Sequence, residues 1–124
     1  ELKKEKNFDA HLNRGIVYSI KKEWEKAFAD FEIASKLNPN SDKLHNNRGF
    51  AYLESGNPNL AAKDFIYLIN KYPKNPSAYF NLAIAYQKQN KFSEALEYAR
   101  KAKSMGQSNA DNLIEQLLKT VAKK

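Results

Sequence analysis

One eight-residue pattern occurs three times in this sequence at a constant spacing. It is written "HLNRGIVY" over residues 11–18, "HNNRGFAY" over 45–52 and, more loosely, "YFNLAIAY" over 79–86. The same spacing aligns the whole of 8–41 with 42–75, and nine positions are then identical. Ordinary composition would give about two identities. A fixed period of this length indicates a stack of similar units, none of which can bury a core alone.

Each unit is predicted to contain two helices. In the first unit, His11, Gly15 and Tyr18 are spaced so that they fall on one face of a helix. In the second helix of that unit, Ala27, Phe31 and Ala34 also fall on one face. The Asn57-Pro58 and Asn75-Pro76 pairs are typical helix starts. We therefore expect helices over 8–21, 24–37, 42–55, 58–71, 76–89 and 92–105. Residues 1–7 are charged and are expected to be a tail or the remnant of a preceding helix.

A small residue sits at the same place in the first helix of every unit. Gly15, Gly49 and Ala83 share this position. We interpret it as the point where the two helices of a unit approach most closely, since a larger side chain would hold them apart. Aromatic side chains are expected to fill the volume around that approach.

These residues give the chain its resemblance to the tetratricopeptide repeat (TPR) family. The shared features are the 34-residue period and the order of a small residue, Tyr, Ala, an aromatic residue and Pro. The pattern stands here as Gly15, Tyr18, Ala27, Phe31, Pro39, then Gly49, Tyr52, Ala61, Phe65, Pro73, then Ala83, Tyr86, Ala95. The third unit departs from it at Ala99 and Gln107. The resemblance implies an all-α, right-handed solenoid of helical hairpins, in three repeats (8–41, 42–75, 76–109), whose concave groove binds other proteins.

A seventh helix is expected over residues 110–124. Its apolar residues fall on one face, and a fourth repeat would need a small residue where Leu117 stands. We therefore expect this helix to cap the stack, as open-ended repeat arrays require. The residues of this face are Leu113, Ile114, Leu117, Leu118 and Val121.

The sequence offers little to build a catalytic or metal site. It has no cysteine and only two histidines, His11 and His45, which occupy equivalent repeat positions without a carboxylate cluster at ligand spacing. The isolated Ser-x-x-Lys spelling over residues 19–22 has no supporting motif. We expect no enzyme activity, no metal and no cofactor, and we assign both histidines to packing.

The net charge of +7 invites a nucleic-acid interpretation, but its distribution disfavours one. Only three of the 21 basic residues are Arg, and the three repeats carry 0, +2 and +3. No apolar run approaches the roughly 20 residues of a membrane span. The chain starts at Glu1 rather than Met, so the compartment stays open: we slightly favour a soluble cytoplasmic protein, with export as the alternative.

Asn13, Asn47 and Asn81 recur two residues before the small position of each repeat. They therefore lie about 200° around the helix from it and face away from the partner helix. The resemblance to TPR proteins implies that this face lines the groove. An amide both donates and accepts, so a row of asparagines could hold a peptide backbone. The alternative is that they bridge neighbouring helices. The full predicted groove set is Asn13, Asn47, Asn81, Leu12, Ile16, Asn46, Phe50, Phe80, Ile84, Lys43 and Lys88.

The sequence thus favours a protein-interaction module that binds an extended or helical segment of a partner. The alternative is a structural piece of a longer repeat array that scaffolds attached domains, and RNA binding is the weakest option. Some TPR domains clamp chaperone-tail carboxylates with residues of the first and third units. Here the first-unit positions hold Leu12 and Ile16, the third-unit positions hold Ser77 and Asn81, and only Asn47 fits. This argues against a chaperone-tail clamp. Arg14 and Arg48 are expected to pack their stems and reach solvent or a carboxylate.

Overall fold

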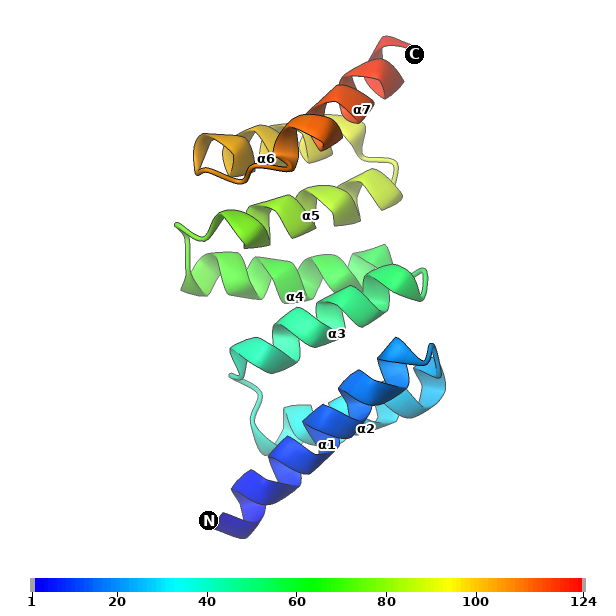
Figure 1. The fold of residues 1–124 in the computed structure, drawn as a ribbon, viewed down its shortest axis with the longest axis vertical. Helices are drawn as coiled ribbons and strands as arrows, with labels where there is room; N and C mark the ends of the chain where they lie inside the picture. Colours follow the sequence, from blue (N-terminus) through cyan, green and yellow to red (C-terminus); the bar gives the residue numbers. More distant parts are fainter. Residues whose placement is uncertain (1, 124) are drawn as a thin grey trace. The chain divides into compact units, whose positions relative to one another are not determined.

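The computed structural model describes residues 2–123, and over this range the chain is helical without any strand. The all-α prediction is thereby confirmed. Figure 1 shows the seven helices in chain order: α1 (Leu2–Ile20), α2 (Trp24–Leu37), α3 (Asp42–Glu54), α4 (Pro58–Lys71), α5 (Pro76–Lys88), α6 (Phe92–Ser104) and α7 (Ala110–Ala122). They form two compact units, which we call unit 1 (residues 1–56) and unit 2 (residues 57–124). No helix among residues 2–123 is both long and apolar enough to cross a bilayer.

The helix boundaries follow local chemistry. The Ser41 hydroxyl accepts a hydrogen bond from the Leu44 backbone N–H at the start of α3, and the Asn75 side chain caps α5 in the same way. Prolines occupy the first turns of α4 and α5. One boundary was predicted wrongly. Residues 2–7, expected to be a separate tail or the remnant of another helix, continue α1, because their lysines and glutamate are good helix formers.

In unit 1, α1 and α2 lie side by side (Figure 1). Gly15 of α1 lies tightly against residues of α2. A Cβ atom added there would lie 2.8 Å from Cε1 of Phe31 and 3.3 Å from the Ala27 carbonyl oxygen. Phe31 is fully buried and forms a core cluster with Ala27 and Ala34. The interpretation of the small residue as a close helix contact is therefore confirmed in this repeat.

The turn between the two helices of each repeat uses one backbone conformation. Lys22, Gly56 and Asn90 occupy the same repeat position, and their φ angles are 61°, 91° and 64°. Only glycine adopts this left-handed conformation freely, while asparagine tolerates it and lysine is strained in it. The backbone conformation of the turn therefore recurs with the same 34-residue period as the side chains.

In unit 2, α7 contributes to the core of the α5–α6 pair. Leu113 and Leu117 are buried in one cluster with the alanines Ala83, Ala95 and Ala99. The large leucine at position 117 therefore packs onto the small residues of the third repeat. The other apolar residues of α7 differ from expectation: Ile114 is half-buried, and Leu118 and Val121 are exposed.

Candidate functional site

The predicted groove residues of unit 1 meet around Lys43. The Lys43 Nζ donates to Asn13 Oδ1 at 3.5 Å, which links α3 to α1. The Asn47 Nδ2 donates to the backbone carbonyl of Lys43 at 2.8 Å, one turn back along α3. Three side chains that the sequence placed on one face are therefore neighbours in the structure, and all three come from α1 and α3.

The hydrogen-bonding capacity of this cluster is only partly used. Asn47 commits one amide hydrogen to its own helix, which leaves its carbonyl oxygen and second hydrogen. Asn13 is exposed, and its 3.5 Å bond to Lys43 is long enough to be weak. The alternative that asparagines bridge helices has support here, since Lys43 and Asn13 form such a link.

Two apolar side chains flank the cluster, and one predicted member does not belong to it. Phe50 is 38% exposed, and Ile16 is half-buried against the core. Leu12, predicted to face the groove, is only 2% exposed. It shares a core cluster with Leu44 of α3, so the packing of α3 on α1 covers this position. The prediction of an accessible apolar pocket at Leu12 is therefore wrong.

The equivalent face of unit 2 is less open. Asn81, which holds the repeat position of Asn13 and Asn47, is only 8% exposed. Phe80 and Ile84 are half-buried and pack against the core clusters, while Lys88 is exposed. The same sequence position thus has different accessibility in the two units. In unit 1, the remaining predicted residue, Asn46, is exposed.

Sequence reasoning missed an ion-pair network inside unit 1. The Asp30 carboxylate, 2% exposed, accepts hydrogen bonds from Arg14 Nε at 2.7 Å, Arg14 Nη2 at 2.8 Å and His11 Nδ1 at 3.0 Å. The Arg14 hydrogen bond lowers the pKa of Asp30 more than burial raises it. Arg14 therefore reaches a carboxylate, as its position suggested. The signal was available, because a repeated Asp on an apolar helix stripe needs a buried partner.

The second missed feature explains the repeated His or Tyr position. In unit 1, His45 Nε2 donates to the carbonyl oxygen of Pro39 at 2.8 Å. In unit 2, Tyr79 Oη donates to the carbonyl oxygen of Pro73 at the same distance. The two donors occupy equivalent positions of successive repeats, as do the two prolines. His45 and Tyr79 therefore tie the start of a helix to the loop before it, whereas the equivalent His11 pairs with Asp30. Each has a structural role beyond simple packing.

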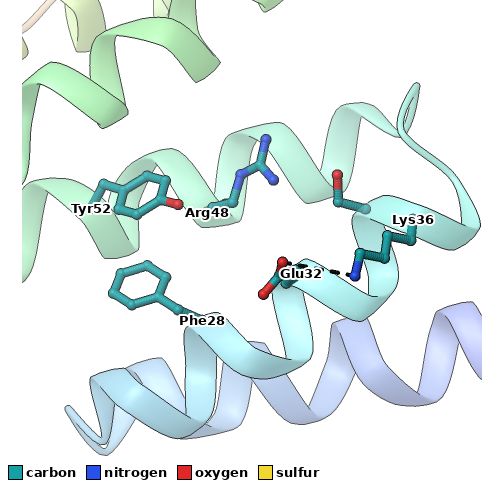
Figure 2. Close-up of a pocket in the computed structure, with 6 residues that line it drawn as sticks. Phe28, Glu32, Lys36, Arg48 and Tyr52 are labelled. Carbon is teal, nitrogen blue, oxygen red and sulfur yellow. Dashed lines mark ion pairs between the residues drawn. The ribbon is translucent and has the colours of Figure 1, made fainter.

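A separate crevice of 480 Å³ lies between α2 and α3 in unit 1, and Figure 2 shows its walls. The rings of Phe28 and Tyr52 stack with centroids 4.6 Å apart and an interplanar angle of 16°. Glu32 and Lys36 form an ion pair of 3.9 Å within α2. In this crevice the aromatic surface is covered by a second ring, and the lysine charge faces a carboxylate.

The described part of the chain contains no cluster of three or more His, Asp or Glu side chains that could hold a metal ion. The chemistry of the faces described above consists of amides, lysines and apolar side chains. Such groups bind a ligand through hydrogen bonds and contact area.

The sequence of this chain is similar to known repeat proteins. The family model described as "Tetratricopeptide repeat" matches residues 46–111. Two curated relatives are similar. The Hsp70-Hsp90 organising protein of Plasmodium falciparum (isolate 3D7) is 29% identical over 76% of this chain, and human Protein O-mannosyl-transferase TMTC3 is 34% identical over 67%. The chain spans only 18% and 9% of the length of these two relatives.

A solved structure with a similar fold is the first TPR of Spaghetti (RPAP3) bound to the HSP90 peptide SRMEEVD. It superposes with a TM-score of 0.83 at 18% identity, covering 94% of this chain and 94% of that chain. This likeness confirms that the chain has the fold of an all-α helical solenoid.

Proposed function

This chain belongs to the tetratricopeptide repeat family, and we propose that it is a non-enzymatic module that binds a segment of a partner protein. The binding residues would be the exposed polar and apolar side chains of the first helix of each repeat. A protein-interaction role is supported by the similar structure that holds an HSP90 peptide.

The observation that carries the proposal is the cluster of Asn13, Lys43 and Asn47 in unit 1, with Phe50 beside it on α3. The unused amide groups can pair with a peptide backbone, and each such bond contributes about 1 kcal/mol net. The exposed Phe50 ring offers an apolar contact for one side chain of the ligand. Lys43 adds a positive charge that would favour an acidic neighbour.

The sequence argument against chaperone tails is not supported by the comparisons. It was based on clamp positions occupied by Leu12, Ile16, Ser77 and Asn81. However, a domain that is similar over 94% of this chain binds the HSP90 peptide SRMEEVD. This peptide is therefore a suitable probe alongside partners captured from the protein's own source.

Both curated relatives carry the matching segment within much longer chains. This supports the alternative that the module acts as a scaffold joined to other domains. The two functions are compatible, because a scaffold can also bind a peptide. A scaffold would contact its partner through other parts of the longer protein as well. A self-sufficient module would bind its partner through these repeats alone.

The test is a capture experiment with matched variants. The 124-residue chain, the double variant Asn13→Ala/Asn47→Ala and the control Asn70→Ala/Asn112→Ala are immobilised and exposed to a lysate of the source organism. Asn70 and Asn112 are exposed and lie outside the predicted groove. Asn81 is left unchanged because it is buried and its loss could disturb folding. Binding of the peptide SRMEEVD is measured in parallel by fluorescence anisotropy.

We expect the control to capture the same proteins as the unmodified chain and the Asn13/Asn47 variant to lose them. Circular dichroism must show equal helicity for all three. If the Asn13/Asn47 variant is folded and recovers the same partners in equal amounts, the proposed site is wrong.

A further inference from the structure

A second crevice, of 280 Å³, lies between α4 and α5 in unit 2. Its apolar surface comes from Ala62 and Ile66 of α4 and from the ring of Tyr86 on α5. Its basic groups are Lys63 on α4 and Lys91 in the turn before α6, and both are exposed. The lining therefore combines apolar area with two positive charges and contains no carboxylate.

This crevice is the repeat equivalent of the one in Figure 2, and its chemistry is different. Ala62 holds the repeat position of Phe28, so no ring from α4 stacks on Tyr86 in the way that Phe28 stacks on Tyr52. Ile66 holds the repeat position of Glu32, so an exposed apolar side chain replaces a carboxylate. In unit 1 Tyr52 stacks on a ring of α2 and Lys36 pairs with Glu32, whereas in unit 2 the Tyr86 ring contacts Tyr98 of α6 at a centroid distance of 5.5 Å, and the exposed apolar side chain of the crevice is Ile66.

Carboxylates lie near this crevice without pairing with its lysines. Burial and then the charges of Tyr98, Glu94 and Glu97 raise the pKa of Tyr86. Among the described side chains, neither Lys63 nor Lys91 has a carboxylate within ion-pair distance, and the Lys91 ammonium lies 5.8 Å from the centroid of the Tyr86 ring. The side chain of Gln89 is fixed, because its Nε2 donates to the Pro58 carbonyl oxygen at 3.2 Å. Ile66 is 38% exposed although it borders this crevice.

The wider unit has the same character. Residues 57–124 contain 11 Lys and Arg against five Asp and Glu, which gives this unit +6 of the chain's net charge of +7. A surface of one charge sign raises the local concentration of oppositely charged partners. The partner that fits this crevice is therefore acidic.

The crevice is distinct from the predicted groove. Tyr86 lies about 200° around α5 from Ile84, the groove residue two positions earlier. A ligand in the crevice would therefore contact a different face of α5 from a ligand in the groove.

From these observations we propose that the α4–α5 crevice of unit 2 is a docking site for an acidic segment of a partner protein that carries one apolar side chain. The apolar side chain contacts Ile66, Ala62 and the Tyr86 ring. The acidic residues on either side of it pair with Lys63 and Lys91. This site goes beyond the proposed groove function and can be occupied independently of it.

The test uses a fluorescein-labelled peptide with two glutamates on each side of a central phenylalanine. Its binding to the full chain is measured by anisotropy at about 50 mM and 300 mM salt, since exposed ion pairs weaken as salt rises. Two further peptides replace the glutamates by glutamine or the phenylalanine by alanine. A single-stranded oligothymidylate serves as a general polyanion.

The charge-reversed variant is Lys63→Glu/Lys91→Glu. Its control, Lys74→Glu/Lys123→Glu, makes the same change in net charge at exposed positions of unit 2 outside the crevice. We expect the crevice variant to weaken binding at least tenfold and the control less than threefold. Amide chemical shifts should change over residues 59–66 and 86–91.

Three results would overturn the proposal. The glutamine or alanine peptide could bind as tightly as the parent, which would remove the charge or apolar requirement. The shifts could concentrate around Phe80, Ile84 and Lys88, which would place the peptide in the groove. The oligonucleotide could bind these lysines more tightly than the peptide, which would make the crevice a polyanion site.

Discussion

Replacing Gly15 by alanine tests the geometry that holds unit 1 together. The added methyl group would lie 2.8 Å and 2.9 Å from two ring carbons of Phe31 and 3.3 Å from the Ala27 carbonyl oxygen. Carbon atoms at optimal contact are about 3.5–4.0 Å apart. The Phe31 ring is fully buried and cannot move into solvent, so the helices must separate or the ring must leave its preferred rotamer.

Two opposing effects set the size of the change. Overpacking a tight core costs about 1–3 kcal/mol. Alanine is better than glycine inside a helix by about 1 kcal/mol, which offsets part of that cost. We therefore expect Gly15→Ala to lower the free energy of unfolding by up to about 2 kcal/mol, although the same substitution at an uncrowded helical site would raise it.

A double-mutant cycle with Phe31 isolates the steric part. Phe31→Ala alone should cost about 3–5 kcal/mol, and Phe31→Leu is the milder version if that variant unfolds. Once the ring is absent, Gly15→Ala should be neutral or stabilising by up to about 1 kcal/mol, which gives a coupling of about 2 kcal/mol. Urea unfolding followed by circular dichroism and by Trp24 fluorescence measures each corner. Equal destabilisation by Gly15→Ala in both backgrounds would refute the proposed clash.

Three further changes test the ion pair, the turn and the loop tie. Asp30→Asn should lower the free energy of unfolding by about 2 kcal/mol at pH 7. Because Arg14 lowers the pKa of Asp30 below its ordinary 3.8, the ion pair stabilises the fold above that pH and loses this effect as the pH falls further. A cost of Asp30→Asn that does not change with pH in urea unfolding would contradict this role of the ion pair. Lys22→Gly should raise the free energy of unfolding by about 1 kcal/mol by relieving the positive φ, seen as a higher melting temperature, and no increase would argue against strain. Tyr79→Phe removes the bond to Pro73 and should cost about 1 kcal/mol with unchanged helicity, whereas an unaffected unfolding midpoint would show that this bond is dispensable.

The repeated positions made the fold predictable from the sequence. Gly15 and Phe31 recur together as Gly49 and Phe65, and a pair that changes together signals contact. The third repeat replaces both members by alanine, at Ala83 and Ala99, and both are fully buried. The start of α1 was not predictable in the same way, because residues 2–7 precede the first repeat and have no counterpart to compare with.

The candidate site was less predictable, since the helical angle gives a direction but not the degree of burial. Leu12 is next to the exposed Asn13 in the sequence but belongs to the core cluster, and its exposure to solvent depends on how α3 packs on α1. Asn13 and Asn81 have the same angle and residue type, yet one is exposed and the other is buried. Burial depends on side chains of neighbouring helices, which a single helical projection does not contain.

In the crevices between successive repeats, the differences between equivalent positions determine what each crevice can bind. Tyr52 and Tyr86 recur at one repeat position, and their rings contact different aromatic partners, Phe28 and Tyr98. The residues around that tyrosine are free to differ, and they do: Phe28 becomes Ala62, and Glu32 becomes Ile66. The first exchange removes a stacking ring and the second replaces a charge by an exposed apolar side chain. A scaffold of repeated helical hairpins can thus give each crevice its own ligand chemistry.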